Sequence, residues 1–175
     1  MAPKAAAWIA VVALLAVPTV AQTPAGGNWT HRISEDKFSG EKSEVFRILA
    51  SEPLSDGPLS GTPVFDIMCR NEKWLDSYLV VPVILGNGDW KSALGIPQMG
   101  VWMRHDGKKH YHFWNIAPDR KTMFADKGST RDLLNASDVR IQFADINQYE
   151  QVALFNPSGI DRVQLNRACG EKTFH

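Results

Sequence analysis

The residues of this chain that could carry chemistry gather around one turn, Asp106-Gly107. His105 precedes the turn, and His110 and His112 follow it two residues apart. On a β-strand this spacing puts both imidazoles on one face, and imidazole is a common ligand of transition metals. Tight zinc sites take three or four ligands, and no fourth ligand is evident here. We therefore predict no metal and no cofactor, and we assign His110 and His112 to a polar binding surface.

Aromatic residues and an arginine flank these histidines. Trp102 and Arg104 lie just before the turn, and Trp114 follows His112 by two residues. Most aromatic side chains pack in cores, but an exposed tryptophan offers a flat platform for a sugar or a peptide. The contacts predicted for the binding surface are therefore Trp102, Arg104, His110, His112 and Trp114.

A catalytic interpretation depends on Asp66, which interrupts the apolar run from Val64 to Met68. A buried carboxyl at this point would have a raised pKa and could work with a histidine such as His112. The same residue can instead alternate outward on a strand. The sequence contains no G-x-S-x-G and no H-E-x-x-H motif. It therefore predicts no catalytic residue, and an envelope hydrolase stays as an alternative.

Cys69 and Cys169 are the two cysteines of the chain. Without a third thiol there is neither a C-x-x-C redox motif nor zinc-finger spacing. An oxidising compartment favours a structural disulfide between them, and two free buried thiols are the alternative. Closing a loop of about 100 residues stabilises a fold by at most about 4.7 kcal/mol, by loop-closure entropy.

Residues 1–21 have the pattern of a secretory signal peptide. A positive charge precedes the apolar run Ala5–Val17, and small residues lead to a cleavage site before Gln22. A membrane span needs about 20 apolar residues, and Pro18 ends this run early, which disfavours a retained anchor. We expect a periplasmic or secreted protein with no membrane insertion after signal removal. The formal net charge is zero, without a basic stripe, so nucleic acid is not an expected partner.

Strands are expected to position these residues. Residues 22–28 hold proline and glycine and are predicted to be a linker, and 29–175 to be a single domain. Asp106-Gly107 is a strong hairpin signal. The segment Trp74–Leu85 is predicted to be a strand that Pro82 places at an edge or a bulge.

Two short helices interrupt the β pattern. One is predicted over Thr130–Ala136 with Ser129 as N-cap, and the other follows Ser158 and ends at Gly170. The second helix would carry Cys169 to a strand cysteine. We therefore predict a mostly β fold, an antiparallel β-sandwich or curled sheet with two short helices, the C-terminal helix disulfide-linked to a strand.

Several segments follow one another in an order that is typical of a known family. They are Asn28-Trp29, Phe65–Asn71, Val101–Gly107, the strand with Trp114, Leu133–Ala136 and Val163–Cys169. This order resembles the periplasmic VasI/TagO-like accessory proteins associated with type VI secretion and related exported domains of unknown function. The resemblance implies a disulfide-bonded β domain with an accessory role in the cell envelope, near peptidoglycan, and it carries over no catalytic residue.

The function expected from the sequence is that of an exported, non-enzymatic binding or accessory module. Its partner would be peptidoglycan or a protein of the cell envelope, recognised by one face of the sheet. The alternatives are a hydrolase that uses a carboxylate and a histidine, and a secreted inhibitor of a partner enzyme.

Overall fold

The computed structural model describes residues 22–24, 28–54, 61–88, 90–170 and 173–174. The predicted signal peptide lies outside these residues. No helix in the described part of the chain is long and apolar enough to cross a membrane.

A single antiparallel sheet of 11 strands forms the body of the protein. Its strand order is β1-β2-β3-β4-β5-β9-β8-β7-β10-β11, and β6 pairs with β7. The two ends of this order do not pair, so the sheet is open. The strands are β1 (Gln22–Pro24), β2 (Trp29–Glu35), β3 (Lys42–Leu49), β4 (Val64–Arg70), β5 (Lys73–Val80), β6 (Trp90–Lys91), β7 (Pro97–His105), β8 (Lys108–Ile116), β9 (Thr122–Ala125), β10 (Val139–Ala144) and β11 (Glu150–Phe155).

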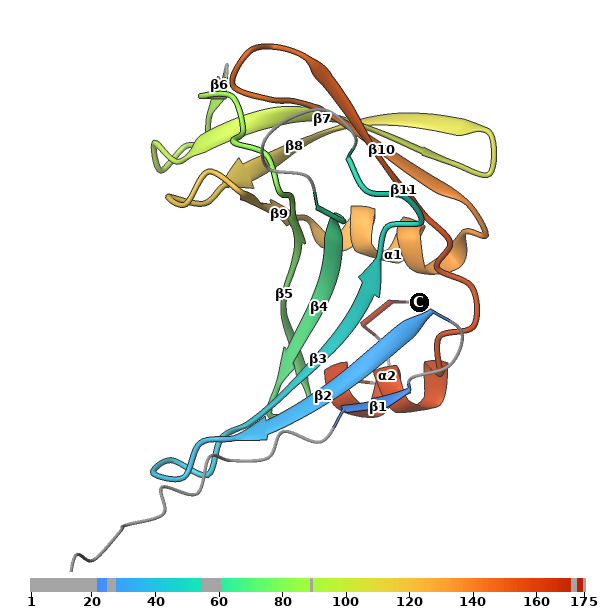
Figure 1. Cartoon of the computed structure of the whole chain (residues 1–175). Coiled ribbons are helices and arrows are strands. Elements are labelled where there is room, and N and C mark those ends of the chain that lie inside the picture. Colours follow the sequence, from blue (N-terminus) through green and yellow to red (C-terminus); the bar gives the residue numbers. More distant parts are fainter. Residues whose placement is uncertain (1–21, 25–27, 55–60, 89, 171–172, 175) are drawn as a thin grey trace, which may run out of the picture.

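The sheet curls around two helices, α1 (Lys127–Asn135) and α2 (Arg162–Cys169), as Figure 1 shows. We call the side that carries the helices the inner face and the opposite side the outer face. Helix α1 contacts β5 and β7, and α2 contacts β4 and β5. The core between the inner face and the helices is a continuous apolar cluster that includes Trp29, Phe65 and Phe155. The predicted curled antiparallel sheet with two helices is confirmed.

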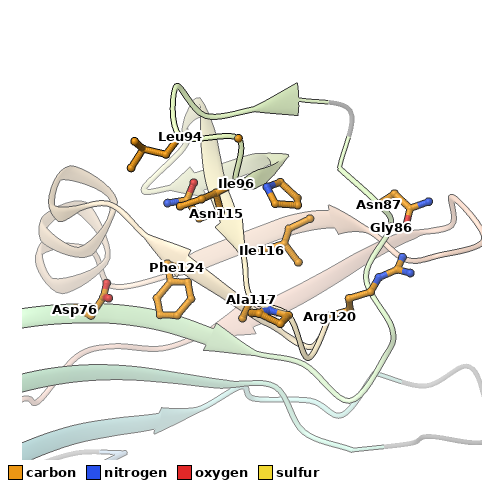
Figure 2. Close-up of a pocket in the computed structure, with 13 residues that line it drawn as sticks. Asp76, Gly86, Asn87, Leu94, Ile96, Asn115, Ile116, Ala117, Arg120 and Phe124 are labelled. Atoms are coloured by element: carbon orange, nitrogen blue, oxygen red, sulfur yellow. The ribbon is translucent and has the colours of Figure 1, made fainter.

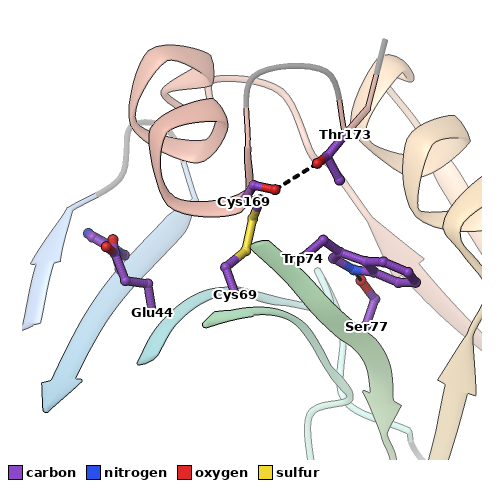
Figure 3. The surroundings of a disulfide bond; sticks show 7 residues. Glu44, Cys69, Trp74, Ser77, Cys169 and Thr173 are labelled. Carbon is purple, nitrogen blue, oxygen red and sulfur yellow. Dashed lines mark hydrogen bonds and ion pairs between the residues drawn. A yellow bond between two sulfur atoms is a disulfide. The ribbon is translucent and has the colours of Figure 1, made fainter. Parts of the chain in front are cut away.

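A disulfide joins β4 to the end of α2 (Figure 3). Cys69 and Cys169 are both buried, with their Cα atoms 5.0 Å apart and a sequence separation of 100. Next to the bond, the Thr173 hydroxyl donates to the Cys169 carbonyl (2.6 Å), and Phe174 packs edge-on against Trp74. The predicted link between a strand and the C-terminal helix is confirmed.

Both helices begin at an aspartate, so the predicted serine N-caps are wrong. The Asp126 carboxylate accepts from the Ser129 amide (2.8 Å), which starts α1 three residues before the predicted position. The Asp161 carboxylate accepts from the Gln164 amide (3.0 Å) and starts α2 in the same way. An aspartate side chain accepts from the free backbone amide three residues after it as well as a serine side chain does. The predicted end of α2 at Gly170 is confirmed.

Two predicted segments differ at their boundaries. β5 ends at Val80 and lies in the interior of the sheet, between β4 and β9. Pro82 therefore follows the strand, because a residue without an N–H cannot continue an interior ladder. Within the expected linker, Gln22–Pro24 pairs with β2 as a short edge strand.

Candidate binding face

The β7–β8 hairpin divides the predicted contact residues between the two faces of the sheet. Trp102 and Arg104 point outward, whereas His110, His112 and Trp114 lie on the inner face. The division follows from strand alternation and from the register, which pairs inner with inner and outer with outer residues. These five side chains therefore cannot form a common contact surface.

Trp114 belongs to the core, and its prediction as a binding residue is wrong. Its side chain is fully buried, and it packs against Phe65 with ring centroids 6.4 Å apart. Its indole N–H donates to the Ser129 hydroxyl (3.2 Å), which satisfies the polar end of the ring. This contact ties β8 to the first turn of α1.

His112 takes part in the same network at the start of α1. Its Nδ1 lies 3.0 Å from the Ser129 Oγ and 3.4 Å from the Asp126 Oδ2. In a Ser-His-Asp triad the imidazole joins serine and carboxylate through its two different nitrogens. Here both partners meet Nδ1, and the Ser129 hydroxyl donates to Asp126 (2.7 Å) and is fully buried. The arrangement anchors a helix, and the serine does not meet the geometry of a nucleophile.

The N-cap carboxylate gives this network a pH dependence. Hydrogen bonds from His112 and Ser129 hold the pKa of Asp126 well below its usual range. A depressed folded-state pKa gives stability that is present above about pH 4 and is lost as the pH falls through the folded-state value. Asp126→Ala should cost about 1 kcal/mol at neutral pH, as other lost N-caps do. Urea unfolding at pH 7 and pH 3 would measure this, and an equal cost at both values would contradict it.

The other predicted histidine, His110, is exposed at the inner side of the hairpin. Its ring stacks on His105 with centroids 5.0 Å apart, and the His112 ring follows at 6.3 Å. Among the described residues, no three histidine, cysteine, aspartate or glutamate side chains converge as metal ligands. The three histidines form a row beside α1, in which the His105 and His110 rings are stacked and the His112 ring is tilted.

Asp66 does not form the acid–base pair of the hydrolase alternative. Its carboxylate is fully buried and makes a bidentate ion pair with Arg47, in which both contacts measure 2.7 Å. Burial, together with the Asp66 charge, raises the pKa of the neighbouring Tyr78 to about 12. The Asp66 carboxylate is thus paired with the Arg47 guanidinium on β3, whereas the partners of His112 are on and beside α1.

The outer face of β6, β7 and β8 carries a row of exposed aromatic side chains. We call the four residues Trp90, Trp102, Tyr111 and Phe113 the aromatic row. Consecutive ring centroids lie 5.4 Å apart from Trp90 to Phe113, 5.1 Å from Phe113 to Tyr111, and 4.6 Å from Tyr111 to Trp102. Each of the four is between 39% and 51% exposed. Larger contiguous patches of exposed apolar surface often mark interaction sites, so the aromatic row is a candidate binding surface.

A row of cations borders the aromatic row. The strand register places Lys109, Arg104 and Arg140 side by side across β8, β7 and β10. The Lys109 ammonium lies 4.1 Å from the centroid of the Trp102 ring, a cation–π contact. The outer face therefore combines flat rings with positive charge, a combination suited to an anionic ligand that also has apolar faces.

Sequence reasoning found only Trp102 and Arg104 of this face. The missed residues follow from the alternation along β8, where Lys109, Tyr111, Phe113 and Asn115 share one side. The alternation could have been read from the sequence, but the face that receives the helices could not. The position of Trp90 on this face could not be predicted either, because it depends on a two-residue strand.

The fold defines a class of protein, a single open antiparallel sheet with two helices on one face and a disulfide to the second helix. Among solved structures, the chain is similar to invasion associated protein B from Bartonella henselae, with a TM-score of 0.51 and 11% sequence identity. The alignment covers 85% of this chain and 95% of that chain. At this identity the likeness shows the fold alone. No protein-family model and no curated protein matches the chain.

Proposed function

We propose that this protein is an exported, non-enzymatic binding module of the cell envelope, and that its outer face binds peptidoglycan. The observation that carries the proposal is the aromatic row with its bordering cations. Peptidoglycan presents the flat faces of sugar rings together with peptide carboxylates. The aromatic row matches the sugar faces, and Lys109, Arg104 and Arg140 match the carboxylates in charge.

The disulfide supports the location outside the cytoplasm that this proposal assigns to the protein. Structural disulfides persist outside the cytoplasm, where thiols are not kept reduced. The signal-peptide pattern of residues 1–21 and the resemblance to VasI/TagO-like accessory proteins point to the same location. The covalent link between the sheet and α2 also helps to keep the sheet face stable.

The proposal is tested by cosedimentation with purified, insoluble peptidoglycan. The wild type should sediment with it, and Trp102→Ala should weaken binding about tenfold or more, as expected for a central aromatic contact. Tyr149→Ala is the matched control, because Tyr149 is also an exposed aromatic (67%) but lies in the β10–β11 connection. Equal sedimentation of wild type and Trp102→Ala would refute the proposed face.

Arg104 and Arg140 provide a test of the charged part of the face. Raising the ionic strength screens exposed charges, so retention of the wild type on peptidoglycan should decrease with salt. The double variant Arg104→Gln/Arg140→Gln should bind more weakly at low salt and lose most of this salt dependence. An unchanged salt dependence would show that these cations do not contact the polymer.

Gly100 leaves room for the aromatic row. It lies on β7 beneath Tyr111, and a methyl group at this position would collide with the Tyr111 hydroxyl. Gly100→Ala should displace the Tyr111 ring and weaken peptidoglycan binding. The stability should change by no more than about 1 kcal/mol, since alanine suits a strand better than glycine and the ring is the free end of an exposed side chain. Binding like that of the wild type would exclude Tyr111 as a contact.

A further inference from the structure

A cavity of about 840 Å³ opens beside the aromatic row, at the bend where β5, β9 and β8 meet (Figure 2). Its volume falls within the roughly 300–1,000 Å³ of small-molecule sites. Phe124 and Ile116 form part of its apolar lining, and Leu94 and Ile96 close it on the side of the loop before β7. This loop is held by its own hydrogen bonds, from the amides of Leu94 and Ile96 to the Ser92 hydroxyl (3.3 and 3.2 Å).

Two opposite charges line the cavity. Asp76 on β5 lies on one side of Phe124, and Arg120 lies on the other side, beyond Ala117 (Figure 2). One N–H of Arg120 donates to the Leu85 carbonyl (2.6 Å), which orients a guanidinium that has further donors.

The carboxylate of Asp76 is available to a ligand. It accepts from the Ser77 amide (3.1 Å), and no ion pair involves it within the described residues. Partial burial raises the pKa of Asp76. A desolvated carboxylate without a cation is unfavourable in the free protein, and a ligand ammonium would relieve that cost.

We propose that this cavity binds a short zwitterionic peptide, with an amine of the peptide at Asp76, its aliphatic part on Phe124 and a carboxylate at Arg120. The inference rests on the proposed function, because it assigns the peptide part of peptidoglycan to the cavity and the sugar part to the aromatic row. The two sites adjoin at Asn115. This residue lines the cavity, accepts from the Gln98 amide (3.0 Å) and lies on the same side of β8 as Phe113.

The test titrates two probes into the folded, disulfide-bonded protein by calorimetry. The first is alanyl-glutamyl-lysine, used with both of its amines free and with both acetylated, and the second is tri-N-acetylchitotriose, a sugar without a peptide. Asp76→Asn keeps the acceptor for the Ser77 amide and removes only the charge. It should bind the tripeptide about tenfold or more weakly than the wild type, as expected for a lost charge-assisted hydrogen bond. Asp132→Asn, a partly exposed carboxylate on α1, is the matched control and should bind normally.

The outcomes separate the cavity from the aromatic row. Acetylation of the tripeptide should weaken its binding as much as Asp76→Asn does. Binding of the free tripeptide should fall as the pH drops through the pKa of Asp76. Chitotriose should be insensitive to Asp76→Asn and sensitive to Trp102→Ala. If the tripeptide does not bind, or binds wild type and Asp76→Asn equally, the cavity proposal is overturned. Asp76-dependent tripeptide binding without any sugar binding would support the cavity and contradict the proposed function.

Discussion

The double variant Cys69→Ala/Cys169→Ala is expected to unfold with a free energy about 4 kcal/mol lower than that of the wild type. The bond spans 100 residues, and removing a loop of this size returns about 4.7 kcal/mol of chain entropy to the unfolded state. Both cysteines are buried, so alanine is used because serine would place a hydroxyl in the core. Urea unfolding followed by tryptophan fluorescence measures the difference.

Reduction provides the control for the cysteine prediction. Adding a reductant to the wild type should lower its urea midpoint toward that of the double variant, whose own midpoint should not respond. If the double variant and the oxidised wild type had the same midpoint, the disulfide would not be the clamp that holds α2 on the sheet.

The second large loss of stability is expected when the charge of Arg47 is removed. Arg47→Met leaves the fully buried carboxylate of Asp66 without its bidentate partner. Breaking a fully buried ion pair costs about 3–5 kcal/mol. The Arg47 side chain is 43% exposed, so water replaces part of the lost interaction. The free energy of unfolding is therefore expected to fall by about 2–3 kcal/mol. Urea unfolding at pH 7 measures it.

Two further variants isolate the ion pair. Arg32→Met removes an exposed arginine from the neighbouring strand and should be nearly neutral. Adding Asp66→Asn to Arg47→Met should recover part of the loss, because the uncompensated charge is then gone. If Arg32→Met were as destabilising as Arg47→Met, the effect would come from general surface charge and not from Asp66.

The fold class was predictable because its strongest signals are local. Asp106-Gly107 marks a tight turn by residue type, and both residues have the positive φ (46° and 82°) that such turns require. The turn between β4 and β5 uses Asn71 and Glu72 at φ 48° and 60°. Glutamate is uncommon in this conformation, so residue type alone does not reveal the second hairpin.

The candidate site was only partly predictable, because it depends on which face of each strand receives the helices. The alternation of β8 separates His112 and Trp114 from Tyr111 and Phe113, but both sets contain aromatic residues. Packing of α1 against His112 and Trp114 makes that side the inner one. Similarly, Asp66 alternates to the outer face between Phe65 and Ile67, but the sequence does not reveal that Arg47 from β3 covers and buries it there.

The aromatic row can be tested most directly by the indole signals of the tryptophans in an NMR titration with soluble peptidoglycan fragments. Trp90 and Trp102 lie on the outer face, half-exposed, whereas Trp29 and Trp114 are fully buried and serve as internal controls in the same spectrum. Shifts of the Trp90 and Trp102 signals, with Trp29 and Trp114 unchanged, are the predicted result. Unchanged Trp90 and Trp102 signals at saturating fragment would contradict the account.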